Sequence, residues 1–472
     1  MTPSLLLSQF RRLVTTADSV EPLRSTLIQL AVEGRLSSDD RGSLWPKRKV
    51  GEVVSFEYGE GLPKELRSDT GPVAVYGSNG VVGYHTHALT HSDAIIVGRK
   101  GSAGALTVAK GPSWATDVAY YVVPPKALDL HYLYFALTTL RLESLSRGIK
   151  PGLSRKEVYD CFISIPPLPD QERIVTQIGA LMSLCTELQA TQSQREKIRD
   201  RLRVAALARL TTPLEMPGKV DRNDVVFFLS DSDRMMTMPE HVDDLRRAIL
   251  DLAVQGRLGG SVAKWESSTV GQMCEFITSG SRGWAQYYSP TGPTFLRAQN
   301  VRFGKLRIDE LAHVRPPEGR EGSRTRVSLS DLVVVITGAG VTNPALVDVD
   351  LGEAYVSQHL GLLRLRQPQA ARWLLLWLMA ERGARGTLVD RAYGAGKPGL
   401  NLDNLRTLHI ALPPAAEQGR IVARVDELMA VCDDLEQALR SADEGRAKLL
   451  DAVLYEALNG PVVDAELAEA TA

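Results

Sequence analysis

The feature that most constrains this chain is a long internal repeat. The hexapeptide "AVEGRL" at residues 31–36 returns 222 positions later as "AVQGRL" at residues 253–258. The match extends upstream, where "VEPLRSTLIQL" precedes the first copy and "VDDLRRAILDL" precedes the second. A chance hexapeptide would not extend in this way. A period above 200 residues also excludes solenoid and propeller repeats, whose units are about 20 to 50 residues long.

Two further shared motifs mark the far end of each copy. "KPGL" occurs at residues 150–153 and 397–400, and "IPPLPDQERIV" in the first copy corresponds to "LPPAAEQGRIV" in the second. The offset has by then grown to 247, so the second copy has a net 25 extra residues in its middle. The chain is therefore interpreted as a pseudo-twofold tandem duplication in which two similar frames hold dissimilar inserts. The two copies span about residues 5–213 and 227–461.

Length and charge limit the kind of protein that this chain can be. At 472 residues it exceeds what one hydrophobic core holds, and about 150 residues per domain predicts roughly three units. Its 55 Lys and Arg residues nearly balance its 56 Asp and Glu residues, for a net charge of −1. This balance argues against a protein that binds polyanions over its whole surface. Any nucleic-acid surface is expected to be local.

Apolar runs and cysteines bear on the compartment. The longest apolar run, around residues 373–380, is about eight residues, too short to span a membrane. The start "MTPSLLLSQFRRL" lacks the apolar stretch of a secretory signal, so a cytoplasmic protein is expected. The four cysteines lie far apart without the spacing of zinc ligands. They are interpreted as buried thiols, with no disulfides and no metal site.

The segment after each proline pair predicts a long helix whose apolar residues alternate at spacings of four and three. This is the pattern of a coiled-coil seam. In the first copy the seam consists of Ile174, Ile178, Leu181, Cys185 and Leu188, and resumes at Ile198 and Leu202. In the second copy it consists of Ile421, Val425, Leu428, Cys432, Leu435 and Leu439, and continues through Leu449 and Val453. We expect the two seams to bury each other in an antiparallel pair; the alternative is that each helix packs on its own insert.

The two inserts change to short β-like runs separated by glycines. Examples are "DAIIVGRKGSAGALTVA" and "VAYYVVP" in the first insert, and "DLVVVITGAG" and "HLGLLRL" in the second. Each insert also contains a predicted helix, "LHYLYFALTT" or "ARWLLLWLMA". The predicted fold class is α+β, with two mixed α/β domains separated by long antiparallel coiled-coil spacer helices. The predicted divisions are an N-terminal helical segment (1–44), the first mixed domain (45–165), spacer helix 1 (166–213), a linker and helical segment (214–264), the second mixed domain (265–412), and spacer helix 2 with the C-terminal tail (413–472).

The order of these motifs resembles one known family. A proline pair leading into a "QxRIV" helix, twice, behind a "KPGL" turn and with a Gly-rich "GRKGSAG" strand exit, is similar to the DNA specificity subunit of type I restriction-modification enzymes. The resemblance covers nearly the whole chain. It implies that each insert is a target-recognition domain for one half of a split, asymmetric site in double-stranded DNA. It also implies that the spacer helices measure the gap between the halves and dock two methyltransferase subunits.

The same resemblance implies a non-catalytic chain without a cofactor of its own. S-adenosylmethionine is then expected in the partner methyltransferase subunits, and a restriction (motor and nuclease) subunit is a further partner that the resemblance allows. Two other hypotheses stay open. A self-contained DNA methyltransferase or nuclease is opposed by the missing cofactor loop and catalytic motif. A coiled-coil scaffold without DNA specificity predicts inserts that can be exchanged without effect on DNA recognition.

Candidate contact residues follow from charge and hydrogen-bonding capacity, since such side chains hold phosphates and read base edges. Segment 282–326 carries nine basic residues against four acidic ones. The predicted DNA contacts are Asn79, Arg99, Lys100, Ser102, Lys150, Arg282, Arg297, Gln299, Asn300, Arg302 and Lys397. Lys150 and Lys397 recur at the same place in both copies, so each is either a turn stabiliser or a phosphate contact. The residues assigned to the spacer helices and partner docking are Ile174, Ile178, Leu181, Leu188, Ile421, Val425, Leu428 and Leu435.

Three motifs that suggest catalysis fail on inspection. "GAGKPG" at residues 394–399 lacks the glycine spacing and the Ser or Thr of a phosphate-binding loop. "GRKGSAG" is followed by another β-like run, whereas a dinucleotide loop leads into a helix. Ile165 and Leu412 precede the proline pairs where an amino-methyltransferase needs a polar residue. The proline pairs are better explained as rigid breaks that start the spacer helices.

Overall fold

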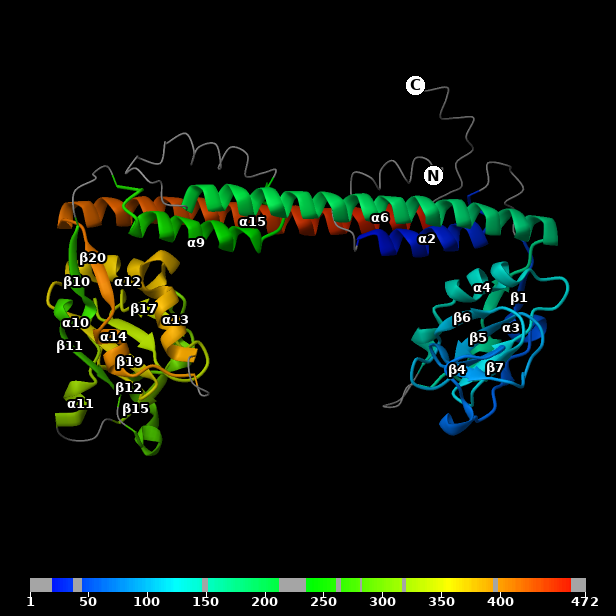
Figure 1. The fold of residues 1–472 in the computed structure, drawn as a ribbon, viewed down its shortest axis with the longest axis horizontal. Coiled ribbons are helices and arrows are strands. Elements are labelled where there is room, and N and C mark those ends of the chain that lie inside the picture. Colours follow the sequence, from blue (N-terminus) through cyan, green and yellow to red (C-terminus); the bar gives the residue numbers. More distant parts are fainter. Residues whose placement is uncertain are drawn as a thin grey trace, which may run out of the picture. The chain divides into compact units, whose positions relative to one another are not determined.

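A computed structural model describes the chain in two compact units (Figure 1). Unit 1 comprises Met1–Lys197 and Glu444–Ala472, and unit 2 comprises Ile198–Asp443. Each unit contains one insert together with part of both long helices. We call residues 45–165 head 1 and residues 265–412 head 2. The residues that the structure describes are 19–36, 45–146, 152–211, 235–259, 265–280, 282–315, 320–393 and 398–459.

Two long helices follow the proline pairs, as predicted. They are α6 (Leu168–Thr211) and α15 (Ala415–Asn459), and no proline interrupts either beyond its first turn. The glutamine of each "QxRIV" motif ties the helix start to the prolines. Gln171 Nε2 donates to the Pro166 carbonyl at 2.9 Å, and Gln418 Nε2 donates to the Pro413 carbonyl at 2.9 Å. Within the described residues no helix has both the length and the apolarity needed to cross a membrane.

The repeated "AVxGRL" motif ends a short frame helix in each copy. These helices are α2 (Val20–Val32) and α9 (His241–Val254). The motif glycines, Gly34 and Gly256, have φ of +73° and +74°, the left-handed conformation that closes a helix and favours glycine. A Cβ atom on either glycine would lie 2.9 Å from an indole carbon of Trp45 or Trp265. The repeat therefore preserves a helix end that packs against a tryptophan.

The first part of α6 is buried in unit 1. Ile174, Ile178, Leu181 and Cys185 join one core with α2 and with the helix in head 1. The last part of α15 packs against the same core. The α15 residues concerned are Leu450, Val453, Leu454, Ala457 and Leu458.

Unit 2 has the same arrangement, but here the start of α15 is buried and the end of α6 packs against it. Ile421, Val425, Leu428 and Cys432 of α15 are buried with α9 and the helix in head 2, and Ala206 and Leu207 near the end of α6 pack against them. The beginning of each long helix therefore meets the end of the other, which confirms the antiparallel pairing. Each long helix also packs on its own insert, so the two expected alternatives occur together.

The prediction that the seams continue through Ile198, Leu202 and Leu449 is wrong. Ile198, Leu202 and Leu449 are 51%, 53% and 55% exposed. Each of the three lies one position away from a residue on the covered face of its helix, because Arg199, Arg203 and Leu450 are half-buried. Near the middle of α6 the covered face continues through Gln192, which is only 4% exposed.

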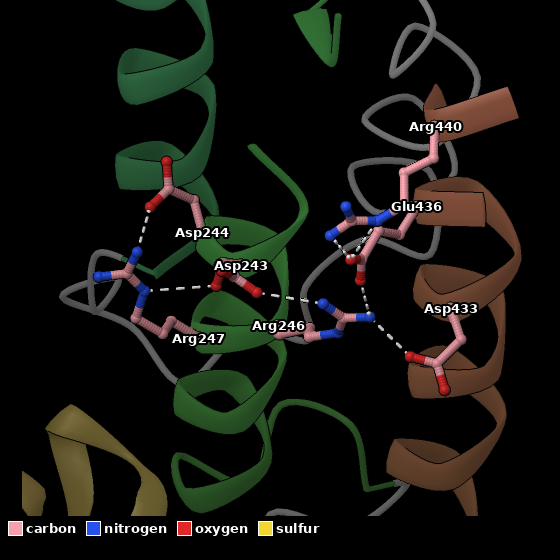
Figure 2. Close-up of polar contacts among 7 residues, drawn as sticks. All are labelled: Asp243, Asp244, Arg246, Arg247, Asp433, Glu436 and Arg440. Carbon is pink, nitrogen blue, oxygen red and sulfur yellow. Dashed lines mark hydrogen bonds and ion pairs between the residues drawn. The ribbon is translucent and has the colours of Figure 1, made fainter. Parts of the chain in front are cut away.

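One arginine joins the short helix to the long helix in both frames. In unit 2, Arg246 of α9 pairs with Asp433 at 2.6 Å and with Glu436 of α15 at 2.7 Å, as Figure 2 shows. Arg440 pairs with the same Glu436 carboxylate at 2.7 Å. In unit 1, Arg24 at the corresponding position donates to Thr186 Oγ1 at 3.1 Å and to Gln189 Oε1 at 3.0 Å. The arginine is thus present in both frames, but its partners on the long helix are neutral in unit 1 and charged in unit 2.

The two heads share one sheet topology, which confirms the mixed α+β fold. Each head has a four-stranded antiparallel sheet. In head 1 its order is β2 (Glu57–Tyr58), β8 (Ala119–Val122), β5 (Ala94–Gly98) and β6 (Leu106–Ala109). In head 2 its order is β11 (Cys274–Ser279), β19 (Leu360–Leu365), β16 (Leu332–Val335) and β17 (Pro344–Leu346).

Smaller sheets also correspond between the heads. The three-stranded sheets are β4 (Gly80–His85), β3 (Val73–Gly77) and β7 (Ser113–Ala115) in head 1, and β15 (Ala312–Val314), β12 (Tyr288–Leu296) and β18 (Ala354–Val356) in head 2. The two-stranded sheets are β1 (Lys47–Lys49) with β9 (Phe162–Ser164), and β10 (Glu266–Thr269) with β20 (His409–Leu412). Head 2 adds the hairpin of β13 (Val301–Arg302) and β14 (Lys305–Leu306), and the helices α11 (Arg320–Arg324) and α13 (Gly386–Tyr393). These additions account for part of its greater length.

The continuous apolar strands lie at the centre because both of their faces are covered. In β5, Ile95 and Val97 pack in the core that contains α4 (Leu130–Thr139), and Ile96 packs toward the three-stranded sheet. In β16, Leu332 and Val334 likewise belong to the core of α12 (Ala371–Met379), while the alternate valines belong to another cluster. In each head of Figure 1, α4 or α12 accordingly lies on the side of the sheet nearest the frame helices.

Candidate nucleic-acid interface

The Gly-rich loop of head 1 brings several predicted contact residues together. It follows β5 and folds so tightly that a Cβ atom on Gly98 would lie 2.1 Å from the Ser102 carbonyl and 2.5 Å from the Ser78 carbonyl. The loop therefore lies against the turn between β3 and β4. Asn79 in that turn, and Lys100 and Ser102 in the loop, are all exposed. These three predicted residues form one polar surface.

Arg99, in the same loop, is half-buried and already has partners. Its Nε donates to the Asp117 carbonyl at 3.1 Å, and its own carbonyl accepts from Leu153 N of the "KPGL" turn at 2.9 Å. Its guanidinium carbon lies 5.4 Å from the ring centroid of Tyr58 and 5.9 Å from that of Tyr120. Both distances are within the range of cation–π attraction.

Arg155, just after the "KPGL" turn, packs on the same tyrosine. Its guanidinium carbon lies 5.0 Å from the Tyr58 centroid, and its Nη1 donates to the Phe56 carbonyl at 3.2 Å. We call Tyr58, Arg99, Tyr120 and Arg155 the Tyr58 cluster. Sequence reasoning did not select Tyr58, because the β2–β8 register that sets Tyr58 opposite Tyr120 is not visible in local sequence.

Tyr120 anchors this cluster to the turn. Its hydroxyl donates to the Leu153 carbonyl at 3.1 Å, and its ring meets that of Tyr58 at 5.1 Å in an edge-on arrangement. Burial, followed by a hydrogen bond with Tyr58, raises the pKa of Tyr120 above its usual 10.0. Tyr120 therefore stays neutral at physiological pH.

Head 2 has the corresponding loop with different side chains. Leu400 N donates to the Ile336 carbonyl at 2.8 Å, so the second "KPGL" turn also closes on the residue after the central strand. The next residue, Thr337, hydrogen-bonds through Oγ1 with His359 Nδ1 at 2.7 Å, and Gly338 has φ of +95°. Sequence reasoning did not select Thr337 or His359, which are far apart in the chain.

Among the head 2 candidates, the structure gives Asn300 a structural role. Its side chain is buried; its Oδ1 accepts from Arg297 N at 3.0 Å, and its Nδ2 donates to the carbonyls of Arg307 and Glu310 at 3.1 and 3.0 Å. These contacts use the oxygen and both N–H donors of the amide, so the Asn300 side chain is hydrogen-bonded within head 2 and not directed to a ligand. Gln299 beside it is exposed.

The basic segment of head 2 is less cationic than its residue count predicts. Arg307 forms ion pairs with Asp309 at 2.8 Å and Glu310 at 3.3 Å, and a hydrogen bond from Arg307 lowers the pKa of Asp309. Arg297 is half-buried, with Nη2 donating to the Glu310 carbonyl at 3.3 Å. Arg302, in β13, is exposed. Arg282 is also exposed, beside the 3-10 turn Trp284–Tyr287.

The other predicted residues either lie outside the described part of the chain or are packed in the cores of the two units. Lys150 and Lys397 lie outside the described residues. The predicted spacer-helix residues pack within their own units, which assigns them to holding the helices together. Six are buried and two, Leu188 and Leu435, are partly buried; the six are Ile174, Ile178, Leu181, Ile421, Val425 and Leu428.

The cysteines are all free thiols, and Cys185, Cys274 and Cys432 are buried. Burial raises the pKa of Cys274 to about 12 and that of Cys432 to about 11, so neither forms a nucleophilic thiolate near neutral pH. In the part of the chain that the structure describes, no three His, Cys, Asp or Glu side chains gather as metal ligands do.

Comparison with known families identifies the arrangement. Residues 42–196 and 327–442 match the family described as "Type I restriction modification DNA specificity domain", and together they exceed half of the chain. The chain belongs to this family. The matched segments of this type I DNA specificity family include the Tyr58 cluster, both "KPGL" turns, and the first parts of α6 and α15.

Individual members of the type I specificity family are distant relatives. The type I restriction enzyme EcoEI specificity subunit of Escherichia coli is 24% identical over 448 residues, covering 79% of this chain and 71% of that protein. The EcoAI specificity subunit of Escherichia coli is 21% identical over 346 residues, and the aligned part is 63% of this chain and 58% of that protein. The chain thus spans little more than half the length of the EcoAI subunit in this match.

A solved structure concerning complex assembly and conformational transition of the type I R-M system has the same fold. Its chain has a TM-score of 0.52 and 16% sequence identity to this one. The superposition covers 88% of this chain and 98% of that chain. At this level of sequence identity, the similarity shows a shared fold but does not show which residues are functional.

Proposed function

We propose that this chain is a non-catalytic, sequence-specific DNA-binding subunit of a type I restriction-modification complex. One observation carries the proposal: two heads of the same topology present different side chains around the same loop and turn. A protein that reads an asymmetric site in two halves needs this combination of a shared scaffold and unlike surfaces. The family membership of the chain supports the same role.

Each head is proposed to read one half of a bipartite, asymmetric site in double-stranded DNA. Side chains with paired donors and acceptors discriminate base pairs in the major groove, by about 1–3 kcal/mol for each good bidentate contact. In head 1 the proposed contacts are Asn79, Arg99, Lys100, Ser102 and Lys150. In head 2 they are Arg282, Arg297, Gln299, Arg302 and Lys397.

The partners are proposed to be methyltransferase subunits. Two of them dock on the spacer helices, and S-adenosylmethionine binds to them and not to this chain. A restriction subunit is a further partner in the same complex, and the complex acts in the cytoplasm. The exposed apolar residues Ile198, Leu202 and Leu449 on α6 and α15 favour contact with another protein at these helices.

Exchange of one head tests the proposal. The full chain is assembled with its methyltransferase subunits, and the methylated bases in random-sequence DNA are mapped by sequencing. Replacing residues 45–165 by head 1 of a relative is expected to change one half of the recognised site and leave the other half unchanged. The reciprocal replacement of residues 265–412 is the matched control and is expected to change only the other half.

Two outcomes would contradict the proposal. An unchanged methylation pattern after either exchange would favour the scaffold hypothesis, in which the heads do not select DNA. Methyl transfer or DNA cleavage by the isolated chain would favour a self-contained enzyme. Both are measured with the same random-sequence library.

A further inference from the structure

The proposal that each head reads one half of the DNA site does not by itself explain the arrangement of the Tyr58 cluster in head 1. Tyr58 is 50% exposed, although it is the common packing partner of two arginines. Backbone carbonyls hold each guanidinium in place: Asp117 for Arg99 and Phe56 for Arg155. The two side chains have therefore already lost much of the conformational entropy that binding a ligand would cost.

The cluster is cationic without internal compensation. Among the described residues, neither Arg99 nor Arg155 forms an ion pair with a carboxylate, whereas Arg307 in head 2 has two such partners. Lys100 and Lys156, next to them in sequence, are exposed. Fixed guanidinium groups with donors left over suit an anionic oxygen ligand. On a protein that binds double-stranded DNA, the ligand of this chemistry is the phosphate backbone.

Head 2 lacks the cluster at the equivalent position. The carbonyls of Arg99 and Ile336 accept the same hydrogen bond from the "KPGL" turn, which makes these two residues equivalent. Tyr58 pairs with Tyr120 in head 1, and Ser279 pairs with Gly361 in head 2. Leu402 occupies the place of Arg155, five residues after its own "KPGL" lysine. Both arginines and both tyrosines are thus replaced by uncharged, non-aromatic residues.

We infer that the Tyr58 cluster is a phosphate clamp that holds the DNA backbone at the first half-site, and that head 2 binds its half without one. The inference rests on the proposed function. Arg99 and Arg155 hold phosphate oxygens, and Tyr58 positions the two arginines without touching a base. The two heads then differ in how much of their affinity is electrostatic as well as in the bases that they select.

Salt dependence of DNA binding tests the clamp. The affinity of the full chain, assembled with its methyltransferase subunits, is measured for its recognised duplex over a range of NaCl concentrations. Arg155→Gln is expected to weaken binding to all sequences equally and to reduce the slope of log affinity against log salt by about 1. Arg155→Lys keeps the charge and is expected to keep most of the slope. Tyr58→Ala is expected to weaken binding with a smaller change of slope.

A matched control separates the clamp from charge in general. Lys110 is exposed after β6, on the edge of the four-stranded sheet opposite to β2. Lys110→Gln removes the same charge and is expected to leave affinity and slope unchanged. Thermal unfolding of each variant checks the fold. If Arg155→Gln does not fold, Arg155→Lys takes its place and is compared with Tyr58→Ala.

The outcomes distinguish the clamp from the proposed function. If the wild-type complex selects a sequence but Arg155→Gln keeps its affinity and slope, the clamp is wrong and the proposed function stands. If Arg155→Gln changes the preferred bases of one half-site, Arg155 reads bases and the phosphate assignment is overturned. If the wild-type complex selects no DNA sequence, both ideas fail.

Discussion

At the scale of single residues, corresponding positions in the two copies of the frame can hold different side chains with different hydrogen-bond partners. Asp251 of α9 is 9% exposed, and its Oδ1 accepts from Arg382 N at 2.8 Å, which joins the frame helix to head 2. Burial raises the pKa of this carboxyl. The first repeat has Gln29 at this position, and Gln29 donates to Glu33 within its own helix instead.

Replacing Asp251 tests this contact. Asp251→Asn keeps the acceptor oxygen without the buried charge, so we expect no loss of stability at pH 7. Asp251→Ala leaves the Arg382 N–H without its acceptor, and we expect a loss of about 1–3 kcal/mol. Because the folded-state pKa is raised, any gain from Asp251→Asn should be present at neutral pH and disappear as the pH falls toward 4. Urea unfolding followed by hydrogen exchange at residues 380–386 measures both variants; equal stabilities for Asn and Ala would contradict the argument.

Residue-level roles are also where sequence reasoning reached its limit. It selected Asn300 as a DNA contact for its hydrogen-bonding capacity, but the carbonyls of Arg307 and Glu310 accept both N–H donors of its amide. It missed Tyr58 because strand register, and not sequence proximity, places Tyr58 between Arg99 and Arg155. Contacts of this kind depend on tertiary structure that no local pattern encodes.

At the scale of elements, the periodic patterns predicted the structure well. The seam spacing located α6 and α15, and the apolar runs located the central strands β5 and β16. The pattern overestimated burial at Ile198 and Leu449, because it followed apolar residues, whereas the covered face of each helix runs through the half-buried neighbours Arg199 and Leu450. A polar residue can occupy a covered position, as Gln192 does, and the apolar spacing does not reveal it.

The contact between α9 and α15 predicts acid sensitivity. Hydrogen bonds from Arg440 and then Arg246 lower the pKa of Glu436 below its usual 4.5. A depressed carboxyl pKa contributes stability above the unfolded-state value, and this contribution is lost as the pH falls through the folded-state value. We therefore expect the α9–α15 contact to weaken below about pH 4.5 in the wild type.

The matched variants are Glu436→Gln and Gln189→Glu. Glu436→Gln should flatten the dependence of stability on pH between about 5 and 3, because no carboxylate remains at this position to titrate. Gln189→Glu should introduce a similar dependence at Arg24 in unit 1. Hydrogen exchange in α9 and α2 reads the two sites separately. An identical acid response in wild type and Glu436→Gln would show that this pair is not the cause.

At the scale of the whole molecule, unit 1 is built from two segments that lie far apart in the chain, whereas unit 2 is one continuous segment. The core of unit 1 contains Leu450, Val453 and Ala457 from the last part of α15, beside α2 and the start of α6. The tandem repeat in sequence is therefore not a tandem pair of independent domains in structure. The sequence shows the duplication, but this division of the helices follows only from their antiparallel pairing.

Truncation after Asp443 tests this construction. Removing the remaining residues takes away the α15 side chains that pack against the core containing Ile178 and Cys185. We expect faster hydrogen exchange in α2 and residues 168–185, and little change in α9 and head 2. Adding a peptide of residues 444–472 should restore protection in unit 1. Equal loss of protection in both units would contradict the division.

The same construction has a consequence for synthesis on the ribosome. Head 1 and the start of α6 emerge before unit 2, whereas the α15 side chains that complete their core emerge after it. Unit 2 is one continuous segment, so all its parts are available before those α15 residues. The nascent chain must therefore keep the apolar surface of unit 1 from aggregating until the last part of α15 is made, and the unit that is begun first is completed second.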